Sequence, residues 1–233
     1  MGGASASSHR RLHGPRTKFA TQPGSVVNGA MQKNLLAFVD NIYEDLELWY
    51  PKLRLEAAGY GMVLAAPEIK LYTGKHGYPA YADALLKEVS SADYCGLLIP
   101  GGFMPDKLRR DPKVKQLTVE FFEAGKLVAF ICHGGWIPIS ARILKGRRVT
   151  GSLGIKDDLE NAGAVWVDEP VVVDGNLISS RTPRDLAAFG EAMVQFLNPE
   201  TKGKSIAAPA LLAPSLDGKE RELKRVMLRD FLK

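Results

Sequence analysis

The sequence predicts an α/β fold, a doubly wound and mostly parallel sheet sandwiched by helices, in a single domain. Two observations predict it. Between residues 34 and 197, short apolar segments alternate with segments of helical spacing, which is typical of parallel strands joined by right-handed crossover helices. Several of the apolar segments, such as LVAFI at 127–131, contain no polar residue, as expected for strands that are buried on both faces.

The two ends of the chain are predicted to lie outside this domain. Residues 1–33 are rich in Ser, Gly and Arg and contain no acidic residue, so we expect a flexible arm, although organelle transit peptides share this composition. Residues 198–233 begin with a linker rich in Gly, Pro and Ala. They end in an expected amphipathic helix, on which Leu223, Met227 and Phe231 recur every four residues.

The first elements of the domain are two strands, a helix and a hairpin. The apolar segments at 34–40 and 61–67 predict the strands, and the alternating segment at 69–83 predicts the hairpin. Residues 44–59 predict the helix, in which Pro51 indicates a kink or a later start. Its apolar residues at helical spacing are Leu46, Tyr50, Leu53 and Ala57.

The remaining elements continue the alternation. Strands are expected at 94–99 and 126–131, separated by a helix that Asp111 caps and Pro112 begins. A helix from the following turn to about Leu144, a basic turn and a helix over 155–163 come next. Strands at 164–167, 170–175 and 176–180 and a helix at 183–197 complete the domain.

Composition excludes several classes of function. The net charge of +5 resides mainly in the first 30 residues, which carry four basic residues, and the rest is close to neutral, so nucleic-acid binding is not expected. Two cysteines are too few for a disulfide framework or a four-ligand zinc site, and no apolar stretch is long enough to span a membrane. We expect a reducing compartment, the cytoplasm, and neither a metal nor a cofactor.

The segment VAFICHGGW at 128–136 predicts a cysteine nucleophile. Cys132 directly follows a buried strand, and Gly134 and Gly135 relieve crowding where the chain turns sharply into a helix. A thiol at a helix N-terminus meets free N–H groups and partial positive charge, which favour the thiolate. His133 is the adjacent base candidate, but successive residues of a helix do not normally face each other.

Three strand ends are expected to meet at one edge of the sheet, because the carboxyl ends of parallel strands point the same way. They bring together Glu44 with its neighbours, the Gly101–Gly102 turn and Cys132. The His133 amide and one amide of the Gly101–Gly102 turn could then form an oxyanion hole.

The segments YEDLEL, IPGGFMPDKLRRD, GKLVAFICHGG and GIKDDLENAGAVWVDEPVVVDGNLISSR resemble the PfpI-like intracellular protease/ThiJ family. This family belongs to the class I glutamine amidotransferase-like superfamily, and the resemblance covers about residues 34–197. It implies a flavodoxin-like fold without a cofactor.

The resemblance also implies roles for individual residues. Cys132 matches the nucleophile, His133 its acid/base partner and Gly102 the oxyanion-hole position. Glu44 matches the acid that hydrogen-bonds the thiol. Asp106 matches a Glu that a neighbouring subunit supplies to hold the His, but its side chain is one methylene shorter. Self-association into a dimer or hexamer is therefore expected.

The leading hypothesis is an enzyme that attacks a carbonyl centre through Cys132. It would be either a peptidase-like hydrolase or a glyoxalase-type enzyme that converts 2-oxoaldehydes to hydroxy acids. A small cavity would favour the aldehyde, and an open groove would favour a peptide. The alternatives are a redox-sensing stress protein with an oxidisable Cys132 and a non-catalytic chaperone or scaffold. Glutamine amidotransferase activity is disfavoured, because it needs a downstream His-x-Glu pair and no histidine follows His133. His76 is expected to be structural or exposed.

Overall fold

The computed structural model describes residues 33–198, so the expectations for the arm and for the C-terminal segment lie outside the described residues. Seven strands form the central sheet in the order β10-β11-β7-β6-β1-β2-β5. All neighbouring pairs are parallel except β10 and β11. The strands are β1 (Asn34–Phe38), β2 (Gly61–Ala66), β5 (Ala84–Leu85), β6 (Gly96–Ile99), β7 (Leu127–Ile131), β10 (Val171–Asp174) and β11 (Leu177–Ser180).

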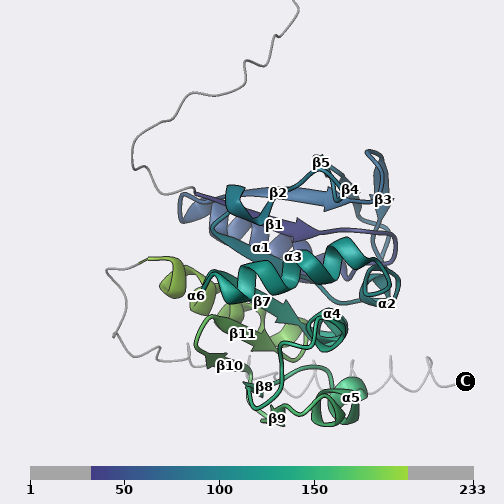
Figure 1. The fold of residues 1–233 in the computed structure, drawn as a ribbon. Helices are drawn as coiled ribbons and strands as arrows, with labels where there is room; N and C mark the ends of the chain where they lie inside the picture. Colours follow the sequence, from purple (N-terminus) through teal and green to yellow (C-terminus); the bar gives the residue numbers. More distant parts are fainter. Residues whose placement is uncertain (1–32, 199–233) are drawn as a thin grey trace, which may run out of the picture. The chain divides into compact units, whose positions relative to one another are not determined.

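Helices cover both faces of this sheet (Figure 1). α1 (Asp45–Ala57) and α6 (Leu186–Leu197) pack against each other on one face, and α3 (Pro112–Glu123) packs against β6 and β7 on the other. The predicted doubly wound, mostly parallel architecture is therefore confirmed. β1, β6 and β7 are buried almost completely because they lie between the two helical layers.

Shorter elements surround the sheet. β3 (Leu71–Thr73) and β4 (Pro79–Tyr81) form the predicted antiparallel hairpin, and β8 (Arg148–Val149) pairs with β9 (Val165–Trp166) in a second small sheet. Three short helices are α2 (Met104–Leu108), α4 (Trp136–Ser140) and α5 (Lys156–Asn161). Single 3₁₀ turns lie at Ser91–Asp93, Cys132–Gly135, Leu153–Ile155 and Pro183–Asp185.

Three predicted details differ, and some short elements were not predicted. α1 begins at Asp45 and contains Pro51, so the later start is wrong. α4 ends at Ser140 rather than near Leu144, because Arg142 adopts a left-handed conformation (φ 59°) that a helix cannot continue through. The strand at Val165–Trp166 pairs with β8 in the basic turn instead of joining the main sheet. β5 and α2 were not predicted.

The apolar stripe that predicted α1 lies on its exposed side. Leu46 and Leu53 are 56% and 59% exposed. The buried side of α1 carries Glu47, Leu48, Pro51 and Leu55. A carboxylic acid therefore faces the interior, which a simple apolar pattern does not reveal.

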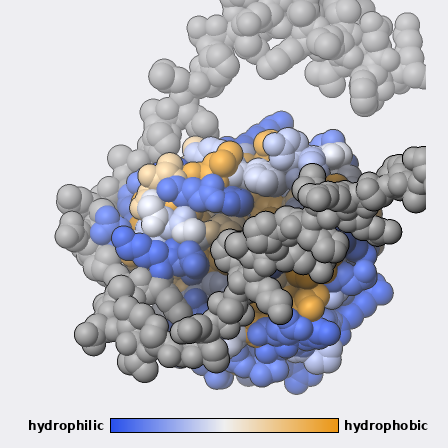
Figure 2. All heavy atoms as spheres, turned by 90° about the horizontal axis from the view of Figure 1, so that it is seen from above, coloured by the Kyte–Doolittle hydropathy of each residue, from blue (hydrophilic) through white to orange (hydrophobic). Residues whose placement is uncertain are grey.

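The surface of the domain is mixed in polarity. On the face that Figure 2 shows, small groups of hydrophobic residues lie among hydrophilic ones. Within residues 33–198, no helix combines the length and the hydrophobicity needed to cross a membrane.

The strand order places a topological switch point between β1 and β6. From β1 the chain proceeds outward to β2 and β5, and then returns to β6 on the other side and proceeds to β7 and β11. Ligand sites of open α/β sheets lie beyond the carboxyl ends of the strands at such a point. The segments after β1, β6 and β7 are the ones that the sequence singled out.

Candidate active site

Cys132 occupies a strained turn at the carboxyl end of β7. Its φ of 58° lies in the left-handed region, which residues other than Gly adopt rarely. The chain then enters a 3₁₀ turn, Cys132–Gly135, that leads into α4. A Cβ atom added to Gly134 would lie 2.4 Å from the carbonyl oxygen of Ile99, so only glycine fits there. The predicted strand-to-helix elbow is confirmed.

This turn brings the side chains of Cys132 and His133 together. The sulfur lies 3.2 Å from Nδ1 of His133 and is partly buried. The elbow geometry thus permits a contact that a regular helix would not. Burial, with a contribution from the positive charge of Lys75, lowers the pKa of His133 below its usual value, so the ring is neutral at neutral pH and can accept a proton.

The acid beside the thiol is Glu47. Its Oε2 accepts a 2.8 Å hydrogen bond from the Gly101 amide, and its carboxyl group interacts with the Cys132 thiol. Oε1 is buried and has no nitrogen or oxygen partner among residues 33–198. Burial, and secondarily the charge of Glu44, raises the pKa of Glu47 to about 8, so at neutral pH this side chain carries a proton that it can donate.

Glu44 does not occupy the predicted place. It lies one turn before Glu47 and caps α1, where Oε2 accepts a 2.9 Å hydrogen bond from the Glu47 amide. Its Oε1 lies 3.6 Å from Nε2 of His76. Glu44 lines the same cavity as Cys132, but the expectation that it is the acid beside the thiol is wrong, because α1 turns Glu47 toward the sulfur.

The thiol is also less acidic than its position at a helix start predicted. Burial and the charge of Glu47 raise the pKa of Cys132 to about 12, although the His133 amide and the Ser152 hydroxyl partly offset them. The resting sulfur is therefore protonated, and the expectation of a resting thiolate is corrected. The proton must leave as the sulfur attacks, and the neutral ring of His133 is the nearest base.

Two amides are placed to stabilise negative charge on a substrate. The antiparallel bridge between Tyr43 and Gly102 uses the amides of Glu44 and Phe103, so the Gly102 amide has no acceptor within the described part of the chain. The His133 amide interacts with the Cys132 sulfur. Gly102 has a φ of 80°, and a Cβ there would lie 2.4 Å from the carbonyl oxygen of Ile42. This arrangement agrees with the oxyanion hole expected at Gly102 and His133, whose role in catalysis stays a prediction.

These groups open into a cavity of about 290 Å³. Its lining residues are Ile42, Glu44, Lys75, Gly102, Phe103, Cys132, His133 and Trp136. Trp136 stacks edge-on against the His133 ring, with the ring centres 5.0 Å apart, and its Nε1 donates to Asp158. A larger cavity of about 530 Å³ lies between α1 and the hairpin turn, but it contains no nucleophile. The candidate nucleophile lies in the smaller cavity.

Asp106 lies on α2 and pairs with Arg110 of the same chain. It does not line the cavity of its own chain, so its predicted contact with the histidine of a neighbouring subunit stays a prediction.

A group of possible metal ligands lies beside the site. Oxygen atoms of Glu44 and Asp45 and a ring nitrogen of His76 lie within 4.8 Å of one another. Both oxygens of Asp45 already accept amide hydrogen bonds, from His76 and Tyr78, so this group also has a clear structural role in holding the hairpin turn. His76 is largely exposed, as expected.

Sequence reasoning missed Glu47, Ser152 and Lys75. A signal for Glu47 was present, since it precedes Pro51 and Leu55 by one and two helical turns and so shares their buried side. Ser152 and Lys75 lie in loops, at positions that depend on how separate segments fold back toward Cys132, so no local pattern indicated them.

The sequence model of the DJ-1/PfpI family matches residues 33–196. The chain belongs to the DJ-1/PfpI family. "Deglycase PfpI" of Pyrococcus furiosus is 45% identical over 157 residues, which are 67% of this chain and 95% of that protein. "Putative cysteine protease YraA" of Bacillus subtilis is 41% identical over 168 residues, 72% of this chain and 99% of that protein.

Solved structures of this family share the fold. The ThiJ/PfpI domain protein of Brachyspira murdochii has a TM-score of 0.70 and 28% identity, over 72% of this chain and 97% of that one. A two-domain Anabaena variabilis protein with DJ-1/ThiJ/PfpI-like and ferritin-like domains also has a TM-score of 0.70, with 37% identity over 74% of this chain. The present chain spans only 52% of that protein.

Proposed function

We propose that this DJ-1/PfpI protein is a cofactor-independent cysteine enzyme that converts small 2-oxoaldehydes to 2-hydroxy acids. The observation that carries the proposal is the cavity of about 290 Å³ in which the Cys132 sulfur lies 3.2 Å from the His133 ring. This volume is at the lower end of the usual range for ligand sites. It suits a molecule of a few heavy atoms better than an extended peptide.

The first step is addition of the sulfur to the aldehyde carbon. His133 Nδ1 takes the thiol proton as the carbon–sulfur bond forms, and the carbonyl π electrons move to oxygen. The Gly102 and His133 amides stabilise that oxygen, and the protonated Glu47 can donate to it. The product is a hemithioacetal.

The second step moves hydrogen between the two carbons. Glu47, which is a carboxylate once it has given its proton to that oxygen, removes the proton from the former aldehyde carbon, and a proton returns at the neighbouring carbon through an enediol. The aldehyde carbon is thereby oxidised to a thioester while the ketone carbon is reduced to an alcohol. Water then cleaves the thioester and restores the thiol, so the reaction consumes one water and needs no external oxidant.

Hydrolysis of adducts or peptides is the second candidate, because relatives are named deglycases and a cysteine protease. The same sulfur, histidine and amides would serve an acyl transfer, since that reaction also passes through an oxyanion. An adduct of a 2-oxoaldehyde with an amine must first release that amine as the sulfur takes its place at the same carbon, and the later steps are then those of the free aldehyde. The cavity volume favours such small adducts over peptides.

We also propose that a partner subunit completes the site with its Asp106. In its own chain Asp106 lies on α2, outside the cavity, and pairs with Arg110. A carboxylate that reached His133 from a neighbouring copy would hold the ring and stabilise its protonated form.

The deciding experiment is steady-state turnover of methylglyoxal, with lactate measured as product, beside turnover of a fluorogenic peptide. We expect the wild type to form lactate and Cys132→Ala to form none. Cys95→Ala should keep the activity, because Cys95 lies at the opposite end of the parallel strands from Cys132. Peptide cleavage without lactate formation would contradict the proposal and would favour the hydrolase instead. Absence of both activities would favour the non-catalytic alternatives.

A further inference from the structure

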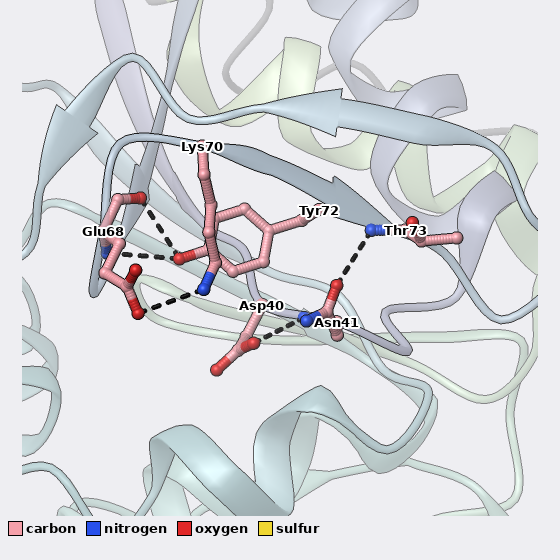
Figure 3. A network of polar contacts seen from close by, with 6 residues as sticks. All are labelled: Asp40, Asn41, Glu68, Lys70, Tyr72 and Thr73. Carbon is pink, nitrogen blue, oxygen red and sulfur yellow. Dashed lines mark hydrogen bonds and ion pairs between the residues drawn. The ribbon is translucent and has the colours of Figure 1, made fainter.

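Lys75 is held at the edge of the Cys132 cavity by its backbone. It follows β3 in the hairpin, and its amide donates a 2.7 Å hydrogen bond to the carbonyl oxygen of Tyr43. The loop after β1 also holds the hairpin at Thr73, whose amide donates to Asn41 Oδ1 (Figure 3). The carbonyl oxygen of Thr73 accepts a hydrogen bond from the Ile42 amide. The position of Lys75 is therefore tied to the loop that leads into Glu44 and Glu47.

The ammonium group of Lys75 has no carboxylate within ion-pair distance in the part of the chain that the structure describes. Its field nevertheless reaches the reacting groups, since its charge lowers the pKa values of Glu47 and His133. Lys75 is thus a cation at the cavity for which residues 33–198 supply no ion-pair partner.

The ionisable groups that line the cavity or lie directly behind its wall leave this cation available. Glu47 and His133 are both neutral at neutral pH, for the reasons given above. Glu44 is the acidic residue that lines the cavity, but one of its oxygens caps α1 and the other lies 3.6 Å from His76. An anion bound in the cavity would find one unpaired cation and two free or weakly used amides.

We propose that Lys75 makes this cavity a site for carboxylate-bearing carbonyl compounds, in which a short chain joins the carbon that Cys132 attacks to a carboxylate that pairs with the ammonium group. Lysine binds such groups as a point charge and adapts through its flexible stem. The substrate assignment, a carboxylated 2-oxoaldehyde, rests on the proposed function. The binding of an anion next to Cys132 does not, and it can be tested without turnover.

The test compares alkylation of Cys132 by iodoacetate and by iodoacetamide, which differ mainly in charge. In both reactions the sulfur displaces iodide and a carbon–sulfur bond forms. The ratio of the two rates is measured at Cys132 by peptide mass spectrometry at pH 7.0, where Glu47 is neutral, in wild type, Lys75→Met, Lys75→Arg and Lys115→Met. Lys115 lies on α3 and does not line the cavity, so this variant controls for the loss of one charge. Cys95 is an internal reference.

We expect Lys75→Met to lower the iodoacetate-to-iodoacetamide ratio at Cys132 by about fivefold, with the ratio kept in Lys75→Arg and Lys115→Met and at Cys95. Salt at 0.5 M should shrink the difference, because the interaction is screened. An unchanged ratio in Lys75→Met would overturn the proposal. So would an equal loss of both rates, which would mean that Lys75 acts on the sulfur and not on the anion.

Measurements of turnover with a charged and a neutral substrate distinguish a failure of this inference from a failure of the proposed function. The substrates are 4,5-dioxovalerate, a 2-oxoaldehyde with a carboxylate, and its neutral methyl ester. Lys75→Met should lower kcat/KM about tenfold for the acid, mainly through KM, and by less than about twofold for the ester. Equal effects on both would contradict the role of Lys75 while the proposed function stands. If neither compound nor methylglyoxal is converted, the proposed function fails, and the alkylation ratio alone decides whether Lys75 recruits anions.

Discussion

The sulfur of Cys132 and Nδ1 of His133 lie 3.2 Å apart although the two residues are consecutive. The left-handed conformation of Cys132 makes this contact, because it turns the thiol out of the path of the following helix. One strained residue therefore preorganises the candidate nucleophile and its candidate base.

Replacing His133 should remove the base while leaving the fold intact. We expect His133→Gln to lower kcat at least 10²-fold, in the range that positioned bases contribute. In wild type, activity should fall only below the usual histidine pH range, because the pKa of His133 is lowered, and the variant should lose this acid limb.

The control for this variant is His76→Gln, which removes the exposed histidine near Glu44. It should retain both the rate, within about threefold, and the acid limb. A pH–rate profile that kept its acid limb in His133→Gln would contradict the assignment of the base.

Glu47 should make the stability of the protein depend on pH. Burial raises its folded-state pKa from the ordinary value of 4.5 to about 8, so the folded state keeps a proton that the unfolded state releases between these values. The free energy of unfolding should therefore be greatest below pH 4.5, as far as this group is concerned, and should fall by a few kcal/mol, as an order of magnitude, as the pH rises to about 8.

Glu47→Gln should flatten this decline, because an amide does not ionise. Urea unfolding at pH 5, 6.5, 8 and 9 measures the effect, and Glu123→Gln on the exposed surface of α3 is the matched control. Parallel pH profiles for wild type and Glu47→Gln would show that burial does not perturb this carboxyl group.

We expect that no other residue can replace Gly102, because a side chain there would clash with the neighbouring backbone. This clash is separate from the strain that the positive φ of Gly102 would cause. In Gly102→Ala the new Cβ would lie 2.4 Å from the Ile42 carbonyl oxygen, so the turn must shift and carry the free amide away from the cavity. We expect lower stability and at least a tenfold loss of kcat, as for a missing oxyanion donor.

Gly125→Ala separates the effect of backbone strain from the effect of a steric clash. Gly125 also has a positive φ, 66°, but nothing lies within 4 Å of an added Cβ. This variant should lose about 1 kcal/mol from backbone strain and keep its kcat. Equal kinetic effects of the two substitutions would contradict the placement of the Gly102 amide in the oxyanion hole.

Mixing two inactive variants tests whether Asp106 acts in a neighbouring subunit. Cys132→Ser lacks the nucleophile but offers Asp106, whereas Asp106→Asn keeps the nucleophile. After subunit exchange, random pairing into dimers should restore about a quarter of the wild-type activity. If Asp106 acts within its own chain, no activity returns. Full activity of Asp106→Asn alone would show that the residue has no such role.

The sequence predicted the fold and the elbow at Cys132 because both depend on local signals. The alternation of apolar strands and helical spacing is sufficient for a doubly wound sheet, and Cys132 followed by glycines is sufficient for an elbow. Glu47 was missed for a different reason. The apolar stripe of α1 lies toward solvent, and the choice between Glu44 and Glu47 depends on how the helix is rotated against the sheet.

The raised pKa of the Cys132 thiol could not be predicted from the sequence either. A helix N-terminus favours a thiolate, but burial and the charge of Glu47 have the larger effect on Cys132. Burial results from packing among β7, the Gly101 turn and α1, which are far apart in the chain. Lys75 likewise reaches the cavity only because the hairpin folds against the loop after β1.

The pairing of β1 with β6 forms a seam in the middle of the sheet, and this seam has a practical consequence. A cut between Leu85 and Ser91 would separate the chain into a fragment with β1, β2 and β5 and a fragment with β6, β7, β10 and β11, joined along that seam alone within the sheet. Glu47 and Lys75 would belong to one fragment and Cys132 to the other. Two separately expressed halves would then regain catalysis only by reassembling, which makes this scaffold a candidate for a split reporter.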